Sequence, residues 1–222
     1  KDDGYPTVFL AKNKSGYHNL TKLSSKAYTD GFYYVPRIDK ALVEQYKEDL
    51  IVTTGGLFGE IPSLILNVGE QQAEEAFVWW KERLGENFYA EINRHGLEEE
   101  NVVNEVLLRF CEKHGVQCIA ANNAYYPSKK QADAHDILLC VKDAQNVSKP
   151  KKYIGKRGRE FRFGMPNDEF YLKSPAEMRK LFADLPEALE TTQSIADSCE
   201  GYQLERDVLL PAFKIPDEFV HA

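Results

Sequence analysis

The sequence has little sulfur, no long hydrophobic run and no excess of positive charge. It contains four cysteines in 222 residues, and none are spaced as a C-x-x-C pair, which argues against a structural zinc knuckle. The cysteines lie in apolar or helix-like stretches, as is typical of reduced, buried thiols, so we expect a cytoplasmic location. Because there is no run of about 18 apolar residues and no signal peptide, we expect no membrane contact.

The sequence also lacks the common short motifs of catalysis. It has no G-x-x-x-x-G-K-[ST] loop that would hold nucleotide phosphates. No Ser/His/Asp or Cys/His arrangement can be assembled from it with any specificity. Its 43% hydrophobic and 12% aromatic residues nevertheless suffice for one sizeable core. A function therefore has to be sought in residues that the fold brings together.

The net charge is −7, because 35 acidic residues outnumber 28 Lys and Arg. This balance excludes a protein that coats nucleic acid through its overall charge. The charge is uneven, however, since residues 149–162 hold seven basic residues and one acid. This stretch is either a solvated loop or a contact for nucleic-acid phosphates or an acidic partner. The basic residues that would make such a contact are Lys151, Lys152, Lys156, Arg157 and Arg159.

Strand-like and helix-like segments alternate over the first 140 residues. Apolar, β-branched runs predict strands at 7–11, 50–54, 88–92 and 117–122. Apolar residues at helical spacing predict helices at 17–27, 39–50, 70–84, 98–114 and 130–141. Alternation of this kind predicts an α/β fold with a mainly parallel sheet or a partial barrel. In such folds the carboxyl ends of the strands meet at one rim.

The character of the sequence changes after residue 143. Residues 146–169 are polar, basic and rich in Gly and Pro, which predicts a loop or crossover. Two helices are then expected, each opened by an N-cap residue three positions before a glutamate. The first pair is Ser174 and Glu177, with Pro175 at the first helical position. The second pair is Asp184 and Glu187.

Seven motifs in order resemble a known family. They are AKNxxGYxNLxKL (11–23), PRID (36–39), GGLxGEI (55–61), FYxEIxRHG (88–96), AHDxLLC (134–140), FYLKSxxEM (170–178) and PEALxxTxxIA (186–196). Together they resemble the polymerase and histidinol phosphatase (PHP) domain at the amino-terminal end of bacterial replicative DNA polymerase III alpha subunits. The resemblance covers residues 7–213, nearly the whole chain.

The resemblance implies a distorted (β/α)₇ barrel with mainly parallel strands. Residues 1–145 would form its carboxyl-terminal part and 146–169 the basic crossover. Residues 170–222 would form a small helical segment that leads toward a polymerase domain. Because the sequence begins without a methionine, we expect it to be a segment of a longer protein. The polymerase domain of that protein would use Mg²⁺, whereas we expect no cofactor in this fragment.

Members of this family that bind metal hold a cluster at the carboxyl ends of the strands, and four of the ligand positions fall within this chain. A His position is occupied by Pro6, and a Cys position by Gly56. The two positions of an Asp-x-His pair are occupied by Asn123 and Tyr125. All four ligands that the family implies are therefore replaced.

The replacements are poor metal ligands on chemical grounds. Pro6 and Gly56 have no coordinating side chain. Asn123 offers a neutral carbonyl oxygen where zinc or manganese would take a carboxylate. Tyr125 is neutral near pH 7, since a phenol has a pKa of about 10. We therefore expect no metal-activated water for attack on a phosphate.

Two further residues are candidates for a residual site. Glu91 and His95 lie near the end of an expected strand, and His95 precedes a glycine and could titrate near neutral pH. The alternative is that both residues only organise the loop. His135 and Asp136 are adjacent on an expected helix and cannot face each other as a dyad, so we expect His135 to pack.

Two functional hypotheses follow. In the first, the segment is a metal-free, catalytically silent scaffold within a polymerase that performs template-directed DNA synthesis. It would dock the proofreading exonuclease subunit and the remaining polymerase domains. In the second, it is an active metal-dependent phosphoesterase or 3′-5′ exonuclease.

Overall fold

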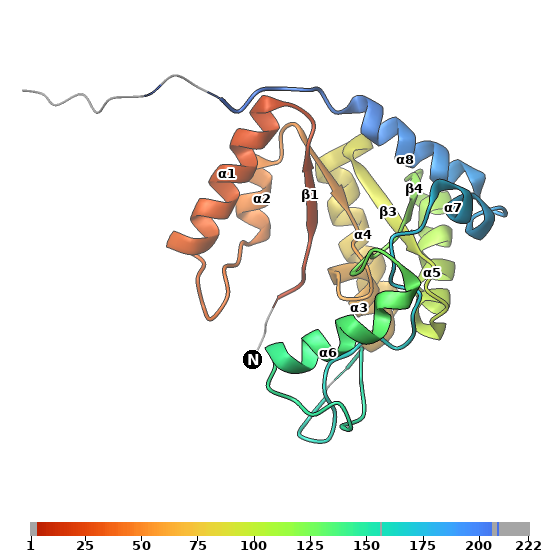
Figure 1. The fold of residues 1–222 in the computed structure, drawn as a ribbon. Helices are drawn as coiled ribbons and strands as arrows, with labels where there is room; N and C mark the ends of the chain where they lie inside the picture. Colours follow the sequence, from red (N-terminus) through yellow and green to blue (C-terminus); the bar gives the residue numbers. More distant parts are fainter. Residues whose placement is uncertain (1–3, 156, 206–207, 209–222) are drawn as a thin grey trace, which may run out of the picture.

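A four-stranded sheet in the order β1-β2-β3-β4 forms the centre of the molecule (Figure 1). The structure is a computed structural model that describes residues 4–155, 157–205 and 208. The strands are β1 (Val8–Ala11), β2 (Leu50–Thr53), β3 (Phe88–Asn93) and β4 (Cys118–Ala121). The expected α/β class with mainly parallel strands is confirmed, because β2-β3 and β3-β4 pair in parallel.

β1 runs antiparallel to β2, with Val8 opposite Thr53 and Ala11 opposite Leu50. The beginning of β1 therefore lies at the same edge of the sheet as the carboxyl ends of the other three strands. We call the segments at this edge, residues 4–7, 54–59, 94–97 and 122–126, the strand-end rim.

Eight α-helices accompany the sheet in the described part of the chain. They are α1 (Lys14–Thr29), α2 (Lys40–Tyr46), α3 (Glu60–Asn67), α4 (Glu70–Leu84), α5 (Glu98–His114), α6 (Ala132–Lys142), α7 (Pro175–Leu181) and α8 (Pro186–Ser198). Short 3₁₀ turns lie at Gly85–Asn87 and Lys129–Gln131. No helix among the described residues has the length and apolar character needed to cross a membrane.

The two ends of α5 are determined by its local sequence. Its first turn carries Glu98, Glu99 and Glu100. Their negative charges stabilise the helix by interacting with the positive end of its dipole. It ends at Gly115, which takes the left-handed conformation with φ 62°. The expected bounds of 98–114 are therefore confirmed.

Three helical expectations need correction. The helix expected at 39–50 ends at Tyr46, and Asp49 has a positive φ of 58° just before β2. α3 is missing from the helices predicted above, and its Pro62 lies in the first helical turn, where proline is tolerated. Asp184 does not cap α8, whose N-cap residue is Leu185.

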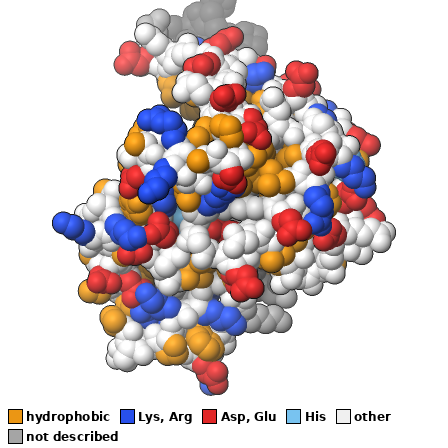
Figure 2. Space-filling view, turned by 90° about the vertical axis from the view of Figure 1, so that its right-hand side faces the viewer, with side chains coloured by type: hydrophobic (Ala, Val, Ile, Leu, Met, Phe, Trp, Pro, Cys, Tyr) orange, Lys and Arg blue, Asp and Glu red, His pale blue; other side chains and the backbone are white. Residues whose placement is uncertain are grey.

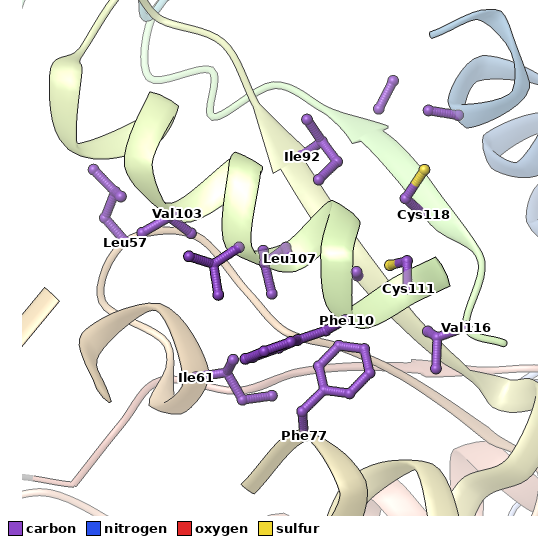
Figure 3. Packing of buried hydrophobic residues seen from close by; sticks show 14 of the residues in the cluster. Leu57, Ile61, Phe77, Ile92, Val103, Leu107, Phe110, Cys111, Val116 and Cys118 are labelled. Carbon is purple, nitrogen blue, oxygen red and sulfur yellow. The ribbon is translucent and has the colours of Figure 1, made fainter. Parts of the chain in front are cut away.

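Both faces of the central strands are buried. Val52, Phe88 and Ile92 belong to the main core, which α3, α4 and α5 cover with Ile61, Phe77 and Leu107 among others (Figure 3). On the opposite face, Ile51 and Ile119 pack against Ile195 of α8. β1 is less covered, because Val8 and Leu10 are 42% and 39% exposed.

The cysteines are all free, as expected, and three of the four are buried. Burial, and after it the neighbouring Cys118, raises the pKa of Cys111 to about 12. The Cys111 thiol is therefore protonated at neutral pH and unreactive.

α7 and α8 lie beside β4, and α7 begins with the expected capping box. The Ser174 hydroxyl accepts from the Glu177 amide at 3.3 Å, and the Ser174 amide donates to the Glu177 carboxylate at 2.8 Å. Tyr171 also donates to Glu177 at 2.8 Å. Figure 2 shows the side of the molecule that carries α7, where charges of both signs are interspersed with hydrophobic side chains.

The capping box predicts a specific acid titration. Hydrogen bonds from Ser174, then from Tyr171, lower the pKa of Glu177 from 4.5 to about 2. A carboxyl with a lowered folded-state pKa stabilises the fold above its unfolded pKa of about 4.5, and this contribution is lost as the pH falls toward about 2. Carboxyl NMR should show Glu177 titrating near 2 in the folded chain. In S174A the pKa should move toward 4.5, and a wild-type value near 4.5 would contradict the capping geometry.

Candidate functional site at the strand-end rim

Three of the four replaced ligand positions meet at the strand-end rim. A Cβ atom placed on Gly56 would lie 2.9 Å from Nδ2 of Asn123 and 3.8 Å from Nδ2 of Asn93. A Cβ atom on the neighbouring Gly55 would lie 3.6 Å from the carbonyl oxygen of Pro6. Segments that precede β1 and follow β2 and β4 are thus brought together, as the predicted rim requires.

Tyr125, the fourth position, has a different set of partners. Its amide donates to the Phe170 carbonyl at 2.8 Å, and its half-exposed ring meets Phe170 edge-on at 6.1 Å. Its phenol lies close to Tyr153 of the 146–169 loop, and the pKa of Tyr153 is raised mainly by burial and next by the neighbouring Tyr125. Tyr125 therefore connects the rim to that loop.

The residues present do not fit the metal cluster that the family implies. Among the residues that the structure describes, no three His, Cys, Asp or Glu side chains are grouped so that they could hold a metal ion. The polar groups nearest to Gly56 are the amides of Asn93 and Asn123, and a neutral amide is a weak ligand for zinc.

Glu91 and His95, the candidate residual site, bind different partners. The Glu91 carboxylate accepts from Thr53 Oγ1 at 2.8 Å and from Asn93 Nδ2 at 3.1 Å. His95 is buried, with its Nδ1 2.6 Å from Oε1 of Glu100 and its ring stacked on Phe170 at 4.3 Å. The structure thus shows an organising contact for each, and their assignment as a residual site stays a prediction.

Three buried polar atoms at or next to the rim have no hydrogen-bond partner among the described residues. They are Oδ1 of Asn93, Nε2 of His95 and the hydroxyl of Tyr126. Such atoms are rare in folded proteins, because an unpaired buried polar group is unfavourable.

The described residues of 146–169 are irregular apart from an isolated bridge between Lys151 and Arg162, and they lie beneath α6 in Figure 1. Arg162 is buried and forms a two-pronged contact with Asp136 of α6, at 2.8 and 2.7 Å. The hydrogen bond from Arg162 is the main cause that lowers the pKa of Asp136. Asp136 therefore pairs with Arg162, whereas His135 packs near Tyr126, with ring centroids 5.3 Å apart.

The other predicted contact residues of the loop are more exposed. Lys152 lies over the Phe161 ring at 5.5 Å and Arg157 over the Phe163 ring at 5.2 Å. Lys151 is 3.9 Å from Asp136, and Arg159 is exposed. Lys156 lies outside the described residues.

Sequence reasoning missed one long-range clamp at this rim. Arg94 follows β3 and donates to both carboxylate oxygens of Asp184 at 2.6 and 2.9 Å, and to the Leu181 carbonyl at 2.7 Å. This clamp ties the end of β3 to the segment between α7 and α8. Nothing in the local sequence indicates it, because the two residues are 90 positions apart.

Crowding between Gly56 and Asn123 predicts an energetic coupling. In G56A the new methyl group would push the Asn123 side chain aside, and in N123A the space for it already exists. We expect G56A to destabilise the wild type but not the N123A background, with a coupling of about 0.5–1 kcal/mol, as is usual for residues in contact. Urea unfolding of the four proteins measures it. G85A is the control, because a Cβ atom there meets nothing within 4 Å, although its positive φ adds strain in both backgrounds. Additive effects of G56A and N123A would contradict the contact.

Comparison with known proteins confirms the resemblance. Residues 1–95 match the family described as PHP domain. The chain is 41% identical over 216 residues to DNA polymerase III subunit alpha of Borreliella burgdorferi, covering 97% of this chain and 18% of that protein. It is 37% identical to the subunits of Treponema pallidum, over 216 residues, and Thermus aquaticus, over 226, with the same coverage. The chain thus spans about 18% of the length of these curated relatives. The chain is therefore similar, over nearly its whole length, to a fragment of bacterial DNA polymerase III alpha subunits, and its first 95 residues match the PHP domain.

Proposed function

We propose that this chain is a metal-free, catalytically silent PHP scaffold within a polymerase that performs template-directed DNA synthesis. It forms part of a distorted (β/α)₇ barrel, and its cytoplasmic role is to hold polymerase domains and the proofreading exonuclease subunit. The polymerase domain of the whole protein uses Mg²⁺, and this fragment uses no cofactor. The observation that carries the proposal is that the four expected ligand positions hold Pro6, Gly56, Asn123 and Tyr125, none of which is a good ligand for zinc.

The contact between Gly56 and Asn123 supports loss of the whole metal centre. A cysteine at position 56 would need the space close to the Asn123 amide, since even its Cβ atom would lie 2.9 Å from Nδ2. One replaced ligand can be tolerated by a metal site, but here two neighbouring positions have been replaced in a mutually compatible way. The rim is then stabilised by packing and amide contacts in place of metal coordination.

The contacts of Tyr125 support retention of the scaffold. Its backbone amide binds the Phe170 carbonyl, and its side chain lies close to Tyr153. Tyr153 is itself buried between Phe58, Phe163 and Phe170, with ring centroids 5.2–5.8 Å away. A position that the family uses for a ligand therefore helps to hold the crossover loop against the rim.

An exposed aromatic loop between α1 and α2 supports a docking role. Phe32, Tyr33 and Tyr34 are 55%, 57% and 69% exposed, and the loop projects away from the sheet in Figure 1. Tyr34 has a positive φ of 64°, and Arg37 lies over the Tyr33 ring at 5.0 Å. A constrained loop that presents aromatic side chains is typical of a protein-binding hot spot.

Metal analysis tests the proposal that this chain binds no metal and is catalytically silent. After dialysis against zinc or manganese we expect a substoichiometric metal content and no hydrolysis of DNA ends. The double variant N123D/Y125H restores the Asp-x-His pair, so it should retain more zinc than the wild type. The control N122D/Y126H places the same residue types one position away. Stoichiometric metal together with DNA-end hydrolysis in the wild type would establish the active phosphoesterase instead.

A capture experiment tests the docking role. The immobilised chain should retain the separately purified proofreading exonuclease subunit, and the triple variant F32S/Y33S/Y34S should retain much less of it. The triple variant I137S/L138S/V141S is a matched control, because it removes three exposed apolar side chains from α6. Equal retention by both variants would exclude the aromatic loop, and no retention by the wild type would exclude docking by this chain.

A further inference from the structure

The described residues of the basic loop, 149–155 and 157–162, form a finger whose two arms lie side by side. The Lys152 amide donates to the Arg162 carbonyl at 2.8 Å, and the Arg162 amide donates to the Pro150 carbonyl at 3.0 Å. The Phe161 amide donates to the Arg157 carbonyl at 3.2 Å. Backbone hydrogen bonds therefore hold the described parts of the finger.

Two buried side chains anchor this finger. The Arg162 guanidinium binds Asp136 and also donates to the Lys149 carbonyl at 2.9 Å. Tyr153 inserts into the aromatic cluster at the rim. Truncating either partner of a buried charge pair is strongly destabilising, so the anchor fixes where the remaining cations stand.

The charges that stay outside the anchor are almost all positive. Arg162 is compensated by Asp136, and Glu160 is the only acid in the loop. Arg157 and Arg159 are exposed, and Lys151 is exposed although it lies 3.9 Å from Asp136. Like charges on one loop repel one another, and a polyanion would relieve the repulsion. Arg157 also stacks on Phe163, which leaves its planar donors oriented for phosphate oxygens.

We propose that Lys151, Arg157 and Arg159 bind the phosphate backbone of duplex DNA. The contact is electrostatic and independent of base sequence. The exposed cations would bind phosphate groups, whereas base sequence is read by an element that enters a groove of the duplex. An acidic peptide would present carboxylates on flexible side chains, whereas the rigid duplex presents closely and regularly spaced charges that match a pre-ordered finger. This binding is independent of metal loss at the rim.

Fluorescence anisotropy with a labelled 20-base-pair duplex tests the proposal on the whole chain. The salt range should start near 0.1 M, where the Debye length is about 10 Å and repulsion from the net charge of −7 is screened. The triple variant K151Q/R157Q/R159Q should weaken binding by at least about tenfold. It should also lower the slope of log K against log salt by about 2.7, since each phosphate contact contributes about 0.9.

A matched variant controls for overall charge. K14Q/R179Q/K180Q removes three other exposed cations and should leave the affinity within about twofold, since these cations make none of the proposed phosphate contacts. Equal weakening by both variants would show a general charge effect and overturn the proposal, as would absence of DNA binding by the wild type. Tighter binding of labelled polyglutamate than of the duplex would assign the finger to an acidic protein instead. The metal content of the same protein, measured separately, tests the proposed function, so a failure of DNA binding can be distinguished from a failure of the metal-free proposal.

Discussion

Burial of β2, β3 and β4 on both faces is the constraint on which the rest of the structure depends. Ile51 and Ile119 pack under α8, while Val52, Phe88 and Ile92 face α4 and α5. A strand buried on both faces is mostly apolar, and a polar residue inside it must be paired, as Glu91 of β3 is with Thr53 and Asn93. The remaining polar groups gather at the strand ends, and the parallel pairing collects three of these ends at one rim.

At the rim, the same constraint explains how ligands could be replaced without loss of the fold. Gly56, Asn123 and Tyr125 follow their strands and do not contribute to the sheet itself. Their replacement changes the rim and leaves the packing of Phe88 or Leu107 untouched. The hydrogen bonds of Glu91 with Thr53 and Asn93 join β2 to β3 directly and help to hold the strand ends at the rim.

The sequence predicted the parts of the fold that depend on neighbouring residues. α5, with its acidic first turn and Gly115, and α7, with Ser174 and Glu177, were placed correctly because caps are local. The convergence of the replaced positions was predictable once the strands were taken as parallel. The antiparallel direction of β1 was not predictable, since the residues of an apolar strand do not indicate whether it pairs in parallel or antiparallel.

Contacts between distant segments were the other part that sequence could not supply. The Arg94–Asp184 clamp joins residues 90 positions apart, and Asp184 had the spacing of a helix cap. In the fold, the Asp184 carboxylate lies 2.6 Å from the Arg94 guanidinium. Asp184 makes this ion pair and does not cap α8. The pairing of Asp136 with Arg162 is also a contact between distant segments. The local sequence around Asp136 does not indicate it.

The rim and the basic finger meet at one aromatic cluster. Tyr125 follows β4 at the rim, and its phenol lies close enough to Tyr153 to help raise the pKa of Tyr153. The Tyr153 ring is held in turn by Phe58 and Phe170. A histidine at position 125 would be shorter than tyrosine and would offer no phenol oxygen to Tyr153. Packing at the rim therefore also sets where the base of the finger lies.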